Sequence, residues 1–391
     1  MDNESLVYKA IEAVNEGCQS YCKFLSANDT GDTGAHQAGI YVAKKAAGIL
    51  FREFGIKGQN KDRLVRILWQ NSFTTESRFI YYGRGSRNEY RITRFEKNFP
   101  FLRPDRTGDL FVLVQLADED YVAYIFATEE EINTFLDAFG LSPTDAGSLI
   151  QTKELIPEEH VDDAINQYIS SLVLDFPPSL EMALAARRLS QLIPNSLTQT
   201  IINPDRALVS WIDMEYRLFR KIEFVRYRTL IEKGFSTVEE FIEIANMVLN
   251  RRKSRAGKSL EHHLASIFDE NRLLYSKQPT TEGNKRPDFI FPSEYSYHNL
   301  KFPSSNLVFL GAKTTCKDRW RQILNEANRI QNKHLFTLQQ GISLKQIEEM
   351  ENEHVVLVVP SQYISAYPAE KRETIWSLKK FIAYTKETTS I

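Results

Sequence analysis

The stretch from Asn284 to Gln331 constrains the fold of this chain more than any other. Within it, the apolar run Asn306–Lys313 has the length and composition of a buried strand and ends in a lysine. Pro287-Asp288 precedes this run, and Glu326 follows it in a segment whose apolar spacing predicts an amphipathic helix. We therefore expect an acid at the start of one strand, a lysine at the end of the next and an acid on the following helix to converge on one point.

These residue types suit the hydrolysis of a phosphodiester. That reaction uses a divalent cation, hard oxygen ligands that hold it, and a positive side chain that orients water or neutralises charge. Asp288 and Glu326 offer the oxygens and Lys313 the charge. The alternative is structural, because Asp after Pro is common in turns and Lys at a strand end is commonly a surface charge. Spacing alone leaves both interpretations open.

Several long blocks of the sequence resemble the EcoRII restriction endonuclease family. The likeness covers nearly the whole chain and is carried by the blocks at residues 26–31, 250–261, 281–289, 313–327 and 334–339. It implies a type II (type IIE) restriction endonuclease that makes sequence-specific double-strand breaks in DNA. Its target would be CCWGG or a related site flanked by CC and GG.

The resemblance also implies a PD-(D/E)xK nuclease domain with a rearranged site. The usual motif has an acid two residues before the lysine, where this chain has Gly311. The family places that carboxylate downstream, which corresponds to Glu326. The implied assignment is Asp288 and Glu326 as Mg²⁺ ligands, Lys313 orienting the attacking water, and Glu261 as an outer support.

The residues that follow the lysine are candidates for base recognition. In relatives, the positions of Lys317, Asp318 and Arg319 read C·G pairs, and the types fit: Lys and Arg donate to guanine, while a carboxylate accepts from cytosine N4. The alternative is a set of surface charges at the start of a helix.

A basic block, Arg251-Arg252-Lys-Ser-Arg-Ala-Gly-Lys258, precedes the nuclease motif. We expect it to lead into a helix and to clamp DNA phosphates through charge and helix N-terminal amides. The alternative is that these charged side chains are simply exposed to solvent at the start of a helix.

The amino-terminal part predicts a helix and then a β domain. Residues 5–25 carry a broad apolar face with helical spacing. Regularly spaced short apolar runs separated by Gly-rich turns follow, which favours a barrel-like β domain. These runs begin at Ile40, Leu64, Arg78, Tyr90, Asp109 and Tyr121.

The segment Tyr82–Arg94 of that domain is rich in arginine, glycine, serine and asparagine. This mixture suits contacts with DNA phosphates and guanine edges. A solvent-exposed hairpin without a DNA-binding role explains it equally well. The resemblance implies a double-split barrel that binds a second target copy as an effector and covers the catalytic cleft until it does so. The matching DNA-binding positions are His36, Tyr41, Arg87, Glu89 and Arg91.

Prolines mark the connection between the two domains, near Phe176 and Ile193. We expect an effector domain at 1–170, a linker region at 171–205 and an endonuclease domain at 206–391. Helices are predicted at 180–189, 207–233 and 237–249, with Gly234 as a C-cap, and a buried strand at 354–360. Strands alternating with helices indicate an α/β catalytic domain.

Composition sets only wide bounds on function. The 391 residues carry 49 Lys+Arg against 51 Asp+Glu, a net charge of −2, so any DNA site must be a local patch. The three cysteines lack the spacing of a zinc site or a disulfide scaffold. Without a long apolar run or signal peptide, we expect no membrane partner and a cytoplasmic location, and the resemblance implies that the cytoplasm is prokaryotic.

The sequence leaves two classes of function open. The first is the Mg²⁺-dependent endonuclease, with double-stranded DNA in two target copies, a second copy of the chain in a homodimer, and a cognate DNA methyltransferase as its functional partner. The second is a DNA-binding regulator that keeps the fold without cleaving.

Overall fold

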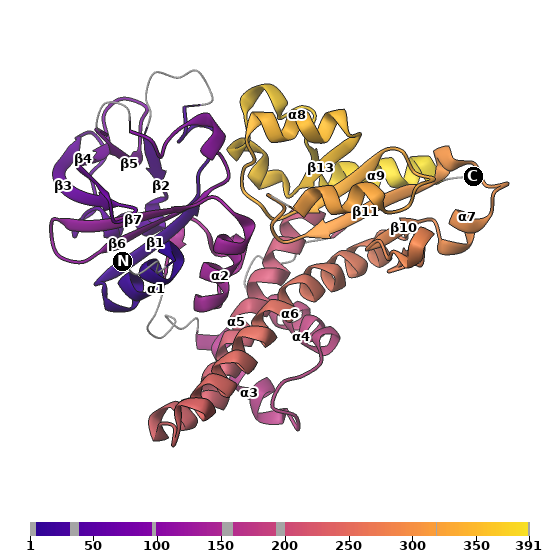
Figure 1. Cartoon of the computed structure of the whole chain (residues 1–391), viewed down its shortest axis with the longest axis horizontal. Coiled ribbons are helices and arrows are strands. Elements are labelled where there is room, and N and C mark those ends of the chain that lie inside the picture. The colour runs from indigo at the N-terminus through magenta and orange to yellow at the C-terminus, as the bar shows by residue number, and fades with distance from the viewer. Residues whose placement is uncertain are drawn as a thin grey trace.

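The computed structural model describes residues 5–31, 39–95, 99–150, 159–192, 200–317 and 319–389. Two of the candidate DNA-binding residues, His36 and Asp318, lie outside these ranges. Figure 1 shows one lobe for each sheet, with the long helices between and below them.

The amino-terminal lobe is a curled sheet with strand order β2-β5-β4-β3-β7-β6-β1-β8. Neighbouring strands are antiparallel except β3 and β7, which are parallel. One cluster of apolar side chains fills the inside of the curl, and a second lies under α1 and α2. The predicted barrel-like β domain is confirmed. Its elements are α1 (Leu6–Glu16), β1 (Gln19–Phe24), β2 (Ile40–Val42), β3 (Lys61–Trp69), β4 (Phe73–Tyr82), β5 (Glu89–Thr93), β6 (Leu110–Gln115), β7 (Asp120–Phe126), α2 (Glu129–Phe139) and β8 (Ser148–Leu149).

The helix predicted over residues 5–25 is wrong beyond Glu16. Gly17 adopts an extended backbone, and β1 then pairs with β6. A side chain at position 17 would stand 2.4 Å from Cγ1 of Val114, so only glycine allows the chain to turn here against the sheet. β1 is buried on both faces after its first residue, which hides the alternation that marks a strand.

Four helices connect the sheets: α3 (Glu159–Ser171), α4 (Ser179–Ser190), α5 (Pro204–Lys233) and α6 (Val238–Glu270). α5 and α6 form a long antiparallel hairpin that turns at Gly234, as predicted, with φ +77°. The expectation that the basic block starts a helix is wrong, because residues 251–258 lie in the middle of α6. The block therefore offers side-chain charge but no free helix N-terminal amides.

The carboxy-terminal lobe is an α/β layer with strand order β14-β13-β12-β11-β10-β9. Strands β11 to β14 are parallel, and β9 and β10 add antiparallel to β11. Helices α5, α6 and α9 cover one face of the sheet, and α8 lies on the other. The elements are β9 (Ser276–Lys277), β10 (Phe289–Phe291), α7 (Glu294–His298), β11 (Val308–Lys313), β12 (Lys333–Thr337), α8 (Leu344–Asn352), β13 (Val355–Val359), β14 (Trp376–Ser377) and α9 (Leu378–Thr389).

The segment after β11 is not the amphipathic α-helix that the sequence predicts. Residues Arg319–Asn325 form 3₁₀ turns, and Glu326 follows them next to Ala327, whose φ is +51°. Trp320 is fully buried in the core. Within the described residues, no helix has the length and apolar content needed to cross a membrane.

Candidate active site

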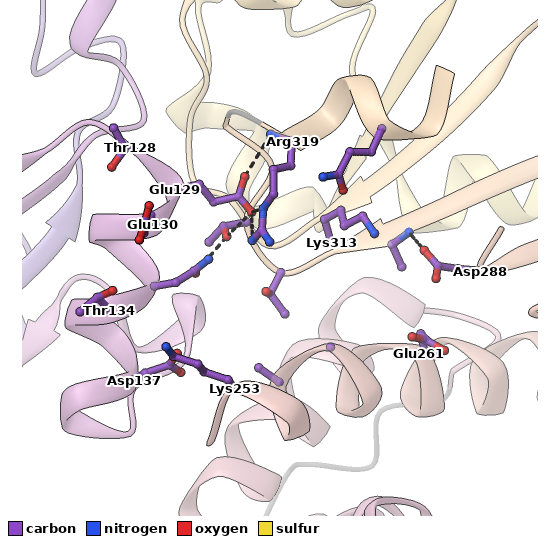
Figure 2. A pocket seen from close by; sticks show the side chains of 17 residues that line it. Thr128, Glu129, Glu130, Thr134, Asp137, Lys253, Glu261, Asp288, Lys313 and Arg319 are labelled. Carbon is purple, nitrogen blue, oxygen red and sulfur yellow. Dashed lines mark hydrogen bonds and ion pairs between the residues drawn. The ribbon is translucent and has the colours of Figure 1, made fainter. Parts of the chain in front are cut away.

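Asp288 and Lys313 lie at the same edge of the carboxy-terminal sheet. Asp288 directly precedes β10, Lys313 ends β11, and the two strands run antiparallel with Phe289 opposite Leu310. The backbone N–H of Ala312 donates to Oδ2 of Asp288 at 2.7 Å, which fixes this carboxylate against β11 (Figure 2). The acid and the lysine are therefore brought together by strand pairing.

Gly311 explains why no acid stands two residues before the lysine. A Cβ at this position would lie 2.9 Å from Cγ2 of Ile323. The close packing of β11 against the 3₁₀ turns thus excludes a side chain there, and a second acid must come from another segment.

Three carboxylates with raised pKa values lie at this edge. Burial raises the pKa of Asp288, Glu261 and Glu326, and the charge of Asp288 raises the pKa of the other two further. Lys313 opposes the shift for Asp288 and Glu326. Such a cluster of acids is unfavourable by itself and is relieved by positive charge.

Lys277 and Gln278 belong to this cluster, although the sequence interpretation missed them. Nζ of Lys277 lies 3.4 Å from Oε2 of Glu261, and the Gln278 side chain donates to the same oxygen at 3.0 Å. The backbone N–H of Gln278 also donates to the carbonyl of Asp288 at 3.0 Å. The strand β9 thereby connects the acid on α6 to the acid before β10.

Lys277 in turn contacts the histidine that follows Glu261 in the sequence. Its ammonium lies 3.3 Å from Nδ1 of His262, whose Nε2 lies 3.1 Å from the hydroxyl of Ser179 at the start of α4. Burial and the neighbouring Lys277 lower the pKa of His262 to about 4. The imidazole is therefore neutral at physiological pH, with Nδ1 accepting from the lysine.

A cavity of about 790 Å³ opens between the two lobes in front of these residues. Glu261, Asp288 and Lys313 line one side of it, and α2 of the amino-terminal lobe forms the opposite wall (Figure 2). Glu326 is not one of its lining residues. Lys253 and Gly257 of α6 form the floor between the two walls.

Glu129, at the start of α2, binds the far rim of this cavity. Its Oε1 accepts hydrogen bonds from Nη2 and Nε of Arg319 at 2.6 and 3.0 Å, and its Oε2 accepts from the Arg319 backbone at 3.2 Å. Thr315 donates to Glu129 at 3.2 Å and contacts Asn133, also on α2, at 3.0 Å. Glu129 is almost fully buried by these contacts.

A second carboxylate of the amino-terminal lobe holds Lys317. Asp109, fully buried at the start of β6, forms an ion pair with the Lys317 ammonium. Beside it the side chain of Gln339 donates to the carbonyl of Gly108 at 2.8 Å. A Cβ on Gly108 would lie 2.2 Å from the carbonyl oxygen of Gly341, so the two lobes touch through their backbones here.

Two family matches cover most of the chain. Residues 14–153 match the family described as "Restriction endonuclease EcoRII, N-terminal", and residues 219–382 match "EcoRII C terminal". The chain is 38% identical over 393 residues to the Type II restriction enzyme EcoRII of Escherichia coli, covering 95% of each protein. This chain belongs to the EcoRII family. It is accordingly a DNA-binding type II restriction endonuclease, with an EcoRII amino-terminal domain and an EcoRII carboxy-terminal domain.

Solved structures similar to this EcoRII-family chain are also restriction endonucleases. One is Ecl18kI, metal-depleted and in complex with uncleaved, modified DNA (18% identity, TM-score 0.45, 60% of this chain and 85% of that one). Another is PspGI in complex with substrate DNA (14% identity, TM-score 0.43, 55% and 93%).

The candidate DNA-binding residues of the amino-terminal domain that the structure describes lie near one edge of its sheet. Tyr41 on β2 is opposite Arg91 on β5, and Nε of Arg91 lies 3.4 Å from Oε1 of Glu89. Arg87 lies in the loop before β5, over the Tyr82 ring. The structure therefore gathers these positions, and their role in DNA binding stays a prediction.

The basic block of this EcoRII-family chain does not face one surface. Arg252 pairs with Glu223 and donates to the carbonyls of Asp137 and Ala138 at the end of α2, at 2.7 and 2.8 Å. Arg251 and Lys258 instead line a separate cavity of about 660 Å³ beside the linker. Arg252 thus contributes to the contact between the lobes, and it does not stand free for phosphate.

The donor set of the EcoRII-type site is chemically suited to a hard divalent cation. Asp288, Glu261 and Glu326 offer carboxylate oxygens whose pKa values are raised by burial and, for Glu261 and Glu326, also by the charge of Asp288. A bound cation would stabilise their charged forms. Within the described residues, however, no three His, Cys, Asp or Glu side chains already stand close enough to hold a metal. The acids therefore fit the ion in the type of their ligand atoms.

Proposed function

We propose that this enzyme is a Mg²⁺-dependent endonuclease that cuts both DNA strands at CCWGG or a related site flanked by CC and GG, and that a second target copy on its amino-terminal domain activates it. The cleavage of DNA follows from membership of the family. The metal, the target and the activation are the proposal.

The proposed chemistry assigns a role to each residue at the sheet edge. Asp288 and Glu326 would hold the Mg²⁺, which supplies Lewis-acid polarisation of the phosphoryl oxygen. Lys313 orients the attacking water and offsets charge that develops at the phosphate. Glu261, held by Lys277 and Gln278, supports the cluster from α6.

One observation carries the proposal of activation: the carboxylate of Glu129 binds Arg319. In the proposed function, Lys317, Asp318 and Arg319 read C·G pairs in the major groove. Glu129 and Asp109 of the amino-terminal domain form ion pairs with two of these residues, Arg319 and Lys317. Target DNA and the amino-terminal domain therefore compete for the same cations, which supports an inhibited resting state.

Activation then requires an effector that prefers the open state. A ligand shifts such an equilibrium only through its different affinity for the two states. DNA bound at Tyr41, Arg87, Glu89 and Arg91, with His36, would favour the open state if the closed lobes hinder its access. The segment that carries Tyr41 is tied to Asp29, whose Oδ1 accepts from the Tyr41 backbone at 2.7 Å. Ala27, two residues before Asp29, donates its backbone N–H to the carbonyl of Ala366 in the other lobe at 2.9 Å.

The remaining assignments belong to the same proposal. The enzyme would act as a homodimer, because two strands of opposite direction are cut, and would work in a prokaryotic cytoplasm beside a cognate DNA methyltransferase that protects the host sites. The domains would divide at 1–170, 171–205 and 206–391. The basic residues Arg251, Arg252 and Lys258 would meet the DNA backbone once the lobes separate.

The direct experiment uses a sequenced plasmid that carries several CCWGG sites. With Mg²⁺ we expect linear fragments whose mapped ends share one short CC/GG-flanked sequence, and with EDTA no cutting. Addition of a short duplex with the same sequence should accelerate cutting of a plasmid with one site. Intact plasmid that merely shifts in a gel would favour the non-cleaving regulator, and ends at unrelated sequences would overturn the target.

A further inference from the structure

Glu326 begins a loop and not a helix. The 3₁₀ turns end at Asn325 and β12 begins at Lys333, and residues 326–332, all of which the structure describes, belong to no helix or strand. Ala327 is buried in this loop with φ +51°, a left-handed backbone that costs free energy in a residue with a side chain. Such a conformation persists only where surrounding groups hold it. The place of the Glu326 carboxylate therefore depends on what binds the peptide groups beside it.

The buried ammonium of Lys333 binds this loop from its inner side. Nζ donates to the carbonyl of Ile330 at 2.8 Å and to the carbonyl of Ala327 at 3.1 Å. Only 5% of Lys333 is exposed, and its ammonium also lies 5.2 Å from the centre of the Phe309 ring on β11. Lysine is rarely buried to this degree without specific partners. Its partners here are two carbonyls of the turn that follows Glu326.

The charge of Lys333 also acts on Glu326. Burial lowers the pKa of Lys333, and the charges of Glu326 and Glu282 oppose that shift. Burial and the charge of Asp288 raise the pKa of Glu326, and Lys313 and Lys333 oppose that shift in turn. Lys333 therefore attracts the Glu326 carboxylate and also holds the backbone next to it.

Two groups from the segment before Asp288 hold the same loop from its exposed side. Nζ of Lys285 donates to the carbonyl of Asn325 at 2.8 Å. Oε2 of Glu282 accepts from the backbone N–H of Asn328 at 3.3 Å. The loop is thus bound on both sides, and its exposed side is tied to the segment that leads into Asp288.

We propose that Lys333 is a positioning residue for DNA cleavage: it holds the loop after Glu326 and so sets where this carboxylate stands relative to Asp288. The inference rests on the proposed function, in which Glu326 is a Mg²⁺ ligand. Gly311 shows why such a residue is needed, because a side chain on β11 at that position would meet Ile323. An acid on β11 would be fixed by strand pairing, whereas an acid on a loop is fixed by hydrogen bonds and charge.

Two measurements on the full-length chain test this role. The first is the Mg²⁺ concentration that gives half the maximal rate of plasmid cleavage. The second is the gain in affinity for a short target duplex that Ca²⁺ produces, because Ca²⁺ also binds oxygen ligands. Lys333→Met should raise the half-saturating Mg²⁺ concentration about 10- to 100-fold and reduce the gain from Ca²⁺, since groups that orient metal ligands affect metal affinity to this extent.

The matched control is Lys371→Met. It removes another lysine of the catalytic domain, one that donates to Glu351 at 2.6 Å beside α8. Both measurements should stay at their wild-type values in this variant. A general loss of stability in the domain would affect the two lysine variants alike, and thermal unfolding of each variant measures that loss separately.

A double change separates positioning from a purely structural role. In a Glu326→Gln background, Lys333→Met should cause no further loss of Ca²⁺-dependent binding, because Lys333 acts through Glu326. Lys285→Met is the second variant, since its side chain is exposed and its removal leaves the core intact. It should raise the half-saturating Mg²⁺ concentration by a smaller factor, and it carries the test if Lys333→Met does not fold.

The outcomes distinguish this inference from the proposed function. A Lys333→Met chain with wild-type dependence on Mg²⁺, or one that loses further Ca²⁺-dependent binding without the Glu326 carboxylate, would overturn the positioning role alone. If Lys333→Met does not fold, an unchanged Lys285→Met chain would overturn it. A wild type whose cleavage is indifferent to divalent cations would refute the metal of the proposed function, and the inference with it.

Discussion

Glu129 of the amino-terminal domain and Arg319 of the catalytic domain, 190 positions apart, form a two-point ion pair, with Oε1 of the glutamate 2.6 Å from Nη2 and 3.0 Å from Nε of the arginine. The glutamate is buried, while the arginine side chain remains half exposed at the cavity rim. Paired guanidinium–carboxylate contacts are stronger and more directional than ordinary surface ion pairs. This contact ties the state of one domain to the availability of Arg319, which we propose reads bases, in the other.

The first prediction concerns the catalytic cluster. Asp288→Ala, Lys313→Ala and Glu326→Ala should each abolish cleavage and retain specific DNA binding, because the lost interactions act mainly on the transition state. Cleavage assays beside gel-shift titrations measure the two effects. Wild-type rates in the Glu326 variant would show that the relocated acid has no catalytic role.

The second prediction concerns Lys277. Burial raises the pKa of Glu261 and the Lys277 ammonium opposes that shift. Lys277→Met should therefore raise the pKa of Glu261 further and move the acid limb of the pH–rate profile to higher pH. Each unit of movement lowers the rate on that limb about tenfold. Lys277→Arg should restore most of the wild-type profile. An unshifted limb in the methionine variant would leave Lys277 with a packing role only.

A third prediction separates base reading from inhibition. In a Glu129→Gln background, where the ion pair is already lost, Arg319→Ala should cost about 1–3 kcal/mol of binding to target duplex and little to random duplex. Arg321→Ala, which removes a nearby exposed arginine paired with Glu349, is the control. Equal losses of affinity for both duplexes would show that Arg319 contacts the DNA phosphates and does not read bases.

The fourth prediction concerns stability and pH. His334 is buried on β12 among Trp376, Phe381 and Tyr384, and burial lowers its pKa to about 4. The unfolded chain therefore binds a proton that the folded chain rejects. Stability from this residue is complete above about pH 6.5 and is lost as pH falls towards 4, about 3 kcal/mol in all.

Denaturant titrations at pH 7 and pH 4.5 measure this effect. His334→Gln should flatten the loss of stability between the two pH values, and the same change at the exposed His298 should not. If both variants lose stability with pH like the wild type, the buried imidazole is not the cause.

Local patterns in the sequence were sufficient to predict part of this architecture. The strand pair that carries Asp288 and Lys313 could be predicted, because an apolar run with a charged end is a local signal. The 3₁₀ turns after Lys313 could not, because the buried pair Trp320 and Ile323 has a spacing of three that suits both kinds of helix. Strand β1, which follows Gly17, was missed for a related reason. It is buried on both faces, so its sequence lacks the alternation of apolar and polar residues that marks a strand.

The contacts between the domains lay beyond any local signal. In the sequence, Glu129 has the position of an acid in the first turn of an ordinary capped helix, and Asp109 lies where a strand begins. Their partners are Arg319 and Lys317, far along the chain, and only the packing of the lobes unites them. The Lys277–His262–Ser179 chain of contacts was missed likewise, because it joins three separate elements.

The central claim is that the amino-terminal domain restrains the catalytic site through Glu129. It is tested most directly by the rate at which the full-length chain cuts a plasmid with one target site, with and without a short target duplex. Glu129→Gln should raise the single-site rate at least tenfold and make it insensitive to the duplex, while Glu130→Gln, on the exposed side of the same helical turn, should behave as wild type. Arg87→Ala with Arg91→Ala should keep the slow basal rate and lose the stimulation. A Glu129→Gln chain that cuts a single site no faster than the wild type, and is still stimulated by the duplex, would contradict the account.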